Sequence, residues 1–132
     1  MTLHVELVVP DREIWSGSAR MVIAKTPDGD LGVLGSHPPV LGILAEGSVV
    51  RILDPESGDS GQAAGDELSV AISGGFLSVF KDRVSILARH AELAREIDVS
   101  AARAQVESAG GGEETAEVKY ARARLRAAGE QA

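Results

Sequence analysis

Apolar and polar residues alternate with a period of two over most of the first 90 residues, which is the pattern of β-strands buried on one face. The clearest run is 3–9, in which Leu3, Val5 and Leu7 share one face and Pro10 stops the strand. Other short runs of strand-forming residues are 14–16, 20–25, 40–44, 48–53, 67–73, 76–81 and 84–88. With a short strand inside 26–41, about eight to ten strands at this spacing predict a β-sandwich or barrel.

The segment 26–41 contains the densest group of backbone-restricting residues in the chain. These residues are Gly29, Gly32, Gly35, Pro38 and Pro39. Asp28 and Gly29 favour a tight turn, since both accept the left-handed backbone conformation. Pro38 favours an extended backbone at His37, and a proline cannot donate a backbone hydrogen bond. We therefore expect a turn, a short strand, a second turn and a rigid bend with polar tips.

The connections between the other strands carry turn residues as well. Gly74-Gly75 and Asp82-Arg83 are the two-residue joints expected between hairpin strands. The segment 54–65 is rich in Gly, Ser and Asp, which predicts a mobile polar loop. The short strand at 14–16 is expected to end at Gly17.

The period changes to that of an α-helix after Glu92. Asp98 is suited to cap a helix over 99–109, and the three glycines at 110–112 are expected to end it. A second helix is expected to open at 113–115. The apolar stripes of the two helices are Ala102, Val106 and Ala109, then Val118, Ala121, Leu125 and Ala128.

Alanine dominates these two stripes, so the helices bury little apolar area, and helices this short are marginal without packing. We therefore expect an antiparallel two-helix hairpin that docks weakly and can detach. The predicted fold is mainly β with an α appendage. A β-sandwich is expected over 1–90 and the helical hairpin over 91–132.

Composition narrows the classes of partner and compartment. The net charge is −7, and 14 acidic against 8 basic residues lie up to Glu96, which argues against nucleic acid or anionic lipid as the main partner. The chain has no cysteine, which excludes disulfides and Cys-ligated zinc. No long apolar run is present, so no direct membrane insertion is expected, and no secretory signal is apparent.

Catalytic and metal motifs are absent from the sequence. It contains no phosphate-binding Gly-Lys-Ser/Thr, no Gly-x-Ser-x-Gly and no His-Glu-x-x-His. The histidines His4, His37 and His90 lie far apart, so no metal site is expected. His37 is either a turn histidine bonded to nearby backbone or an interface contact. Three hypotheses stay open on these residues: a partner-binding subunit, a ligand-binding sandwich with a helical lid, and an enzyme that uses His37 with Asp28 or Asp30.

Several ordered motifs resemble the epsilon subunit of F-type ATP synthases, which is called delta in mitochondria. The first is Gly-Asp-Leu-Gly-Val-Leu at 29–34, followed by Gly-Ser-His-Pro-Pro-Val-Leu at 35–41. The second is Ala-Ile-Ser-Gly-Gly-Phe-Leu-Ser-Val at 71–79. The third joins Leu87-Ala88 and Glu92 to Ile97-Asp98. The resemblance covers nearly the whole chain.

The resemblance implies a ten-stranded sandwich, two C-terminal helices and no catalysis by this chain. It implies a central-stalk (rotor) subunit that couples rotation of the c-ring to the gamma subunit and the catalytic head. The helices would extend toward the alpha and beta subunits of that head and inhibit ATP hydrolysis. The complex would use proton transport for ATP synthesis, with this chain peripheral on the cytoplasmic face of the cell membrane. Motif position implies a c-ring contact at Asp28, Gly29, Asp30 and Leu31 and a gamma contact at His37, Pro39, Val40 and Leu41.

Some members of this family bind ATP through Ile/Leu-Asp-x-x-Arg-Ala at the start of the first helix. Glu92, Ile97, Asp98 and Ala102 match that pattern here. The arginine position is Ala101, which removes a charged contact worth roughly 1.5 to 3 kcal/mol. No cofactor is therefore expected. The short second helix also shortens the reach of the hairpin by about 1.5 Å per missing residue.

Overall fold

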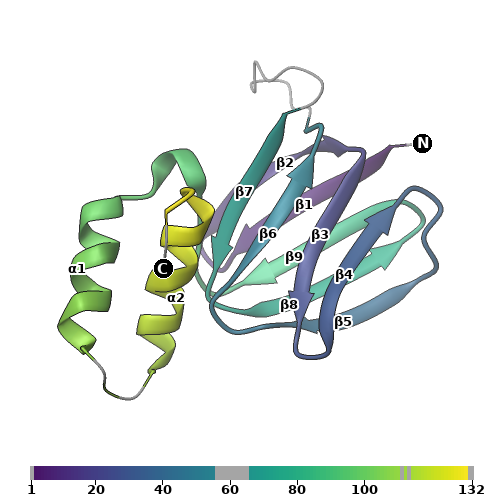
Figure 1. Ribbon diagram of the computed structural model, residues 1–132. Helices are drawn as coiled ribbons and strands as arrows, with labels where there is room; N and C mark the ends of the chain where they lie inside the picture. Colours follow the sequence, from purple (N-terminus) through teal and green to yellow (C-terminus); the bar gives the residue numbers. More distant parts are fainter. Residues whose placement is uncertain (1, 56–65, 111, 113, 131–132) are drawn as a thin grey trace.

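The molecule is a β-sandwich with two helices beside it. The computed structural model describes residues 2–55, 66–110, 112 and 114–130. Within those ranges, ten β-strands form two five-stranded sheets packed face to face, and two α-helices lie beside one of them (Figure 1). The predicted fold class, a mainly β chain with a helical appendage, is confirmed. Most of the loop predicted at 54–65 lies outside the described residues.

Each sheet contains five strands. Sheet A has the order β2 (Arg12–Ala19), β1 (Leu3–Val9), β9 (Arg83–Ala88), β8 (Gly75–Phe80), β5 (Val40–Leu44). Sheet B has the order β10 (Ala91–Leu93), β7 (Glu67–Ile72), β6 (Ser48–Leu53), β3 (Met21–Thr26), β4 (Gly29–Leu34). Neighbouring strands are antiparallel except β1 and β9, which are parallel. The core lies between the two sheets.

Inward-facing aliphatic residues fill that core. Val5 and Ile86 of sheet A and Val50 and Val70 of sheet B are 0% exposed and belong to one cluster. Burial of each such side chain contributes roughly 1.5 to 3 kcal/mol, which is offset largely by the entropy of ordering the chain. Leu3, Val5 and Leu7 of β1 are all buried, so the alternation in this strand predicted its buried face correctly.

The predicted hairpin joint at Gly74-Gly75 is wrong. β7 pairs with β6 and β10 in sheet B, whereas β8 pairs with β5 and β9 in sheet A, so the chain crosses from one sheet to the other at this point. The φ angles of +133° at Gly74 and +149° at Gly75 explain why glycines stand there. A hairpin does join β8 and β9, but its turn residues are Lys81 and Asp82 (φ 49° and 62°) and not the predicted Asp82 and Arg83, because Arg83 pairs with Phe80 as the first residue of β9.

The strands β2 and β10 differ from the prediction because pairing partners override local composition. β2 does not end at Gly17, since Gly17 pairs with Val5 of the neighbouring strand. β10 was not predicted at all. It has only three residues, too few to show a period, yet it pairs with Val70–Ile72 of β7 and extends sheet B beyond residue 90.

The helices begin close to where the sequence placed them. A short 3₁₀ helix, η1 (Ala94–Glu96), leads to α1 (Val99–Ala109), and Asp98 caps α1 by accepting a hydrogen bond from the Ala101 amide at 3.0 Å. Thr115 caps α2 (Ala116–Ala127) in the same way. The two helices lie side by side and antiparallel, with α2 between α1 and sheet B (Figure 1).

The α2 stripe is wider than predicted because α2 has neighbours on two sides. Val118, Ala121 and Leu125 are buried as expected. Ala123 and Ala127 are also buried, and they pack against Ala71 and Val49 on the outer face of sheet B.

Candidate functional site

The β3–β4 turn forms a stiff, acidic tip. Thr26 pairs with Gly29 across the turn, and the Thr26 hydroxyl donates to the Gly29 carbonyl at 2.8 Å while it accepts from the Asp28 amide at 3.2 Å. Asp28, Gly29 and Asp30 are exposed. Leu31 is half-buried and packs against the core, so it anchors the tip from behind.

The β4–β5 bend lies at the other end of β4 from this tip. The Ser36 amide donates to the Asp82 carboxylate at 2.6 Å, which ties the bend to the β8–β9 turn. The His37 amide donates to the Leu34 carbonyl at 3.2 Å, and His37 Nδ1 lies 2.7 Å from the Pro38 carbonyl oxygen. His37 is therefore bonded to nearby backbone, and these contacts do not test whether it also contacts a partner.

The tip and the bend are too far apart to form one catalytic site. Asp28 precedes the six-residue strand β4, Asp30 is the second residue of that strand, and His37 lies three positions beyond its end; a strand of that length spans roughly 20 Å. The structure therefore does not bring His37 together with either carboxylate, and the enzyme hypothesis that combined them is not supported. Among the described residues, no cluster of three metal-ligating side chains was found.

The outer face of sheet A carries exposed apolar side chains. A row across four neighbouring strands is formed by Ile43, Phe76, Leu87 and Val8, which are register partners. Ile43 is 61% exposed, Phe76 51% and Leu87 52%. Leu41, 77% exposed, follows on the edge strand β5 next to the bend. We name Leu41, Ile43, Phe76 and Leu87 the apolar face.

Sequence patterns contained a signal for the apolar face that strand prediction alone does not use. Phe76-Leu77 and Ile86-Leu87 are consecutive apolar residues within strands, so one side chain of each pair must point outward. Contiguous exposed apolar residues of this kind mark partner-binding surfaces. Of the predicted gamma-contact residues, Val40 is half-buried against the core, while Pro39 and Leu41 are exposed.

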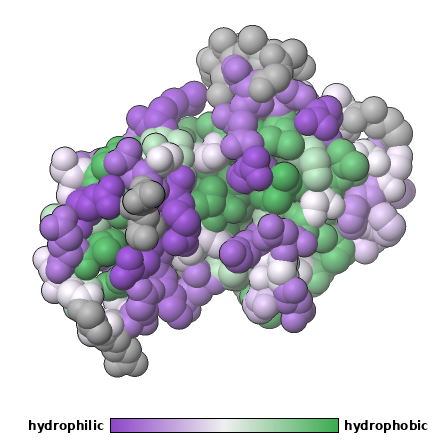
Figure 2. All heavy atoms as spheres, viewed as in Figure 1, coloured by the Kyte–Doolittle hydropathy of each residue, from purple (hydrophilic) through white to green (hydrophobic). Residues whose placement is uncertain are grey.

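A second group of apolar side chains lies on the outer face of sheet B beside the hairpin (Figure 2). Met21, Ile23 and Leu53 are half-buried there, and Leu34 is 49% exposed. The surface of the hairpin in the same view is largely polar (Figure 2). The hairpin thus covers only part of this apolar surface.

Gly47, in the turn between β5 and β6, receives the backbone of α2. A Cβ atom at this position would lie 2.5 Å from the Lys119 carbonyl carbon and 2.6 Å from its oxygen, and the φ angle is +60°. The Gly47 carbonyl also accepts a hydrogen bond from Arg126 at 3.1 Å. Only a residue without a side chain permits this approach of helix and sandwich.

Glu92, on β10, is the main charged contact between sandwich and hairpin. Its Oε1 atom accepts a hydrogen bond from the Tyr120 hydroxyl at 2.9 Å and lies 2.7 Å from Arg124 Nε. The Arg124 N–H does not point at that oxygen, so this contact is an ion pair without an aligned hydrogen bond. Burial, followed by the hydrogen bond to Glu92, raises the pKa of the Tyr120 phenol, so the phenol remains a donor.

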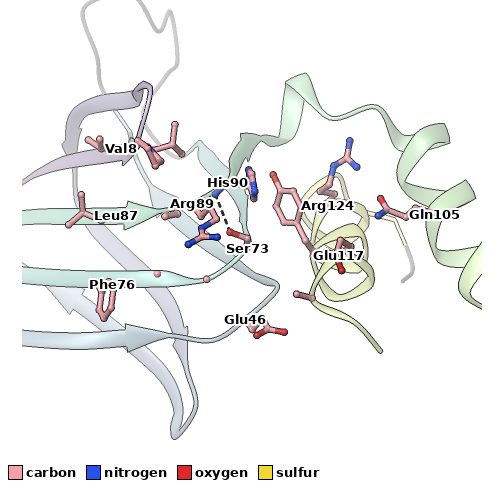
Figure 3. Close-up of a pocket in the computed structure, with 17 residues that line it drawn as sticks. Val8, Glu46, Ser73, Phe76, Leu87, Arg89, His90, Gln105, Glu117 and Arg124 are labelled. Carbon is pink, nitrogen blue, oxygen red and sulfur yellow. Dashed lines mark hydrogen bonds between the residues drawn. The ribbon is translucent and has the colours of Figure 1, made fainter. Parts of the chain in front are cut away.

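A cleft of about 900 Å³ separates the end of the sandwich from the hairpin (Figure 3). Val8, Phe76 and Leu87 line its sandwich side, and Gln105, Glu117 and Arg124 line its hairpin side (Figure 3). The apolar row on sheet A therefore continues into the cleft.

The four residues that match the ATP-binding pattern lie around the start of α1. Glu92 contacts Tyr120 and Arg124, and the Asp98 carboxylate accepts from the Ala101 amide. Ile97 packs against the cluster formed by Ala71, Ala123 and Ala127, and Ala102 is 0% exposed. Ala101, at the arginine position of the pattern, is exposed.

No described helix is long and apolar enough to cross a membrane. The described part of the chain thus has an acidic tip, a rigid bend beside an apolar face, and a docked hairpin.

The sequence matches the family model of the β-sandwich domain of the ATP synthase delta/epsilon chain over residues 2–94. It is 52% identical to the ATP synthase epsilon chain of Thermobifida fusca over 132 residues, which covers 96% of this chain and 91% of that one. It is 47% identical to the epsilon chain of Frankia casuarinae over 93 residues, which are 70% of this chain and 99% of that one. That relative is therefore shorter by about the length of the hairpin.

A solved structure supports the fold over both the sandwich and the helices. A chain in the OSCP/F1/c-ring part of the Euglena gracilis mitochondrial ATP synthase superposes with a TM-score of 0.69 at 23% identity. The match covers 96% of this chain and 81% of that chain. From its sequence relatives, this chain belongs to the ATP synthase delta/epsilon family, as an epsilon subunit of an F-type ATP synthase.

Proposed function

We propose that this epsilon subunit is a non-catalytic part of the central stalk that couples rotation of the c-ring to the gamma subunit and the catalytic head. The observation that carries the proposal is the rigid stretch 26–41, whose two ends present different surfaces about one strand length apart. A part that transmits torque between two partners must resist bending. The cross-turn hydrogen bonds at Thr26 and the Ser36–Asp82 contact provide that stiffness.

The tip is the proposed contact with the c-ring. Asp28, Gly29 and Asp30 are exposed and would meet the loops of the ring, while Leu31 fixes the tip to the core. Charged side chains suit a contact that depends on orientation, because rim charges affect association and register more than lasting affinity. Attachment through this tip would make the chain a peripheral protein on the cytoplasmic face of the cell membrane.

The bend and the apolar face are the proposed contact with gamma. His37, Pro39, Val40 and Leu41 lead directly into the exposed side chains of β5 and β8. An apolar surface of this extent would be covered in the assembled complex. Burial of this apolar face would supply most of the affinity for gamma, whereas the charged tip would mainly set the orientation on the c-ring.

The hairpin is the proposed regulatory element. It would detach, extend toward the alpha and beta subunits and inhibit ATP hydrolysis. The epsilon chain of Frankia casuarinae matches this chain over 99% of its own length but over only 70% of this one, which supports the view that the sandwich is the essential part of an epsilon chain. The partial match to the ATP-binding pattern at Glu92, Ile97, Asp98 and Ala102 is untested, and with Ala101 at the arginine position no bound nucleotide is expected.

Cross-linking from single introduced cysteines in the assembled complex tests the two contacts. The chain has no cysteine of its own, so each product can be assigned to the introduced position. Asp28→Cys is expected to form a product with the c subunit and Leu41→Cys a product with gamma. Asp66→Cys, at an exposed position just before β7, is the control and should form neither product. The assignment is wrong if Asp28→Cys and Leu41→Cys give the same products as the control.

A further inference from the structure

The contact between hairpin and sandwich is poor in apolar area. On the sandwich side, Ala71 and Val49 meet Ala123 and Ala127 of α2. Alanine side chains contribute little burial compared with the leucines and isoleucines of the core. Polar contacts must therefore contribute much of the difference between docked and released hairpin.

The polar contacts to α2 differ in how strongly water screens them. Glu46 lies 3.5 Å from Lys119, but these side chains are 51% and 43% exposed. Exposed pairs of this kind contribute little to stability. Glu92 and Arg124 are 30% and 15% exposed, and the Tyr120 hydroxyl joins the same carboxylate oxygen. The less exposed cluster is the stronger contact.

The geometry of this cluster allows a single carboxylate to hold two turns of a helix. Tyr120 and Arg124 are four residues apart and therefore lie on one face of α2. The centre of the Tyr120 ring lies 5.8 Å from Arg124 Cζ and 6.1 Å from the centre of the His90 ring on the sandwich. Glu92 precedes η1 and α1, so it stays with sheet B when the hairpin moves.

We propose that Glu92, Tyr120 and Arg124 form a latch that keeps the hairpin docked in the free subunit without bound nucleotide. The charge of Glu92 is the controlling element, because one oxygen of its carboxylate contacts both Tyr120 and Arg124. The regulatory meaning of the latch rests on the proposed detachment of the hairpin. The latch also explains how docking persists in a chain with Ala101 at the arginine position of the ATP-binding pattern.

Hydrogen exchange on the full-length subunit tests the latch, with α2 amides as the readout and sandwich amides as the internal reference. Glu92→Gln keeps the shape and an acceptor for Tyr120 but removes the charge. It is expected to speed α2 exchange by about tenfold or more, without a change in β6 or β7. Glu46→Gln, which removes the solvated charge beside Lys119, is the matched control and should change α2 exchange by less than about twofold.

The latch is wrong if Glu92→Gln behaves like Glu46→Gln. It is also wrong if Glu92→Gln speeds exchange equally in the sandwich strands, since that result indicates a general loss of stability. The double variant Glu92→Gln/Arg124→Gln should exchange about as fast as Glu92→Gln alone, because both changes remove the same ion pair. Additive effects would contradict a shared contact.

A nucleotide control separates the latch from ligand binding. Addition of Mg-ATP to the unaltered subunit is expected to leave α2 exchange unchanged. A slowing of about tenfold would show that nucleotide holds the hairpin and would overturn the nucleotide-independent latch. These measurements use the free subunit, so they can contradict the latch even if the cross-links to gamma and the c subunit form. Equally, the cross-links can be absent while the exchange results support the latch.

Discussion

Gly75→Ala is expected to lower the free energy of unfolding of the sandwich by roughly 3 to 5 kcal/mol, which places it among the most damaging single substitutions. A Cβ atom at this position would lie 1.9 Å from the Leu87 carbonyl oxygen and 2.9 Å from its carbon. Both contacts are to backbone of the neighbouring strand β9, which cannot move without breaking the pairing of Gly75 with Ala88. The φ angle of +149° adds backbone strain for alanine.

Urea unfolding of the full-length chain measures this effect. Gly42→Ala is the matched control, because Gly42 lies in the neighbouring strand β5, has no positive φ, and has open space within 4 Å of the position that a methyl group would take. We expect that control to change stability by less than about 1 kcal/mol. Equal urea midpoints of unfolding for the two variants would contradict the close contact between Gly75 of β8 and the Leu87 backbone of β9.

Gly47→Ala is expected to release the hairpin while the sandwich stays folded. The added methyl group would overlap the Lys119 backbone of α2, and the left-handed conformation of the turn costs alanine roughly 1 to 2 kcal/mol. The overlap disappears when α2 moves away, so the docked state alone bears that part of the cost. Released helices of this length are expected to fray, since isolated short helices are marginal in water.

Limited trypsin digestion measures the release, because Lys119, Arg122 and Arg126 are cleavage sites within α2. We expect α2 of the Gly47→Ala chain to be cut about tenfold faster or more, while the sandwich fragment persists. Gly29→Ala is the control, since Gly29 also has a positive φ of +131° but nothing near its Cβ position. Similar cleavage rates in the two variants would contradict direct packing of the α2 backbone against Gly47.

Local patterns predicted most of the strands and both helix starts, because each depends on neighbouring residues. Leu3, Val5 and Leu7 follow the period of a strand, and the Asp98 carboxylate satisfies a free amide in its own first turn. The errors came from features set by distant pairing. β10 exists because β7 offers it an edge, and Gly74 connects two sheets that the sequence alone could not distinguish.

The candidate contacts also divide into local ones, which the sequence predicted, and long-range ones, which it did not. The tip at Asp28 and the bend at His37 are made by consecutive residues, so turn chemistry located them. The contact of Glu92 with Tyr120 joins residues 28 positions apart, and Gly47 meets a helix from far along the chain. Such contacts depend on how α2 lies on sheet B, which no local pattern specifies.

The role of the hairpin is tested most directly by ATP hydrolysis of the assembled complex with the full chain and with a chain that ends at Glu96. The shortened chain keeps all ten strands of the described ranges, and the relative from Frankia casuarinae is similarly short. We expect it to assemble with gamma and the c-ring as the full chain does, and to raise the rate of ATP hydrolysis. Loss of assembly, or an unchanged rate in a fully assembled complex, would contradict a sandwich that couples the rotor and a hairpin that regulates it.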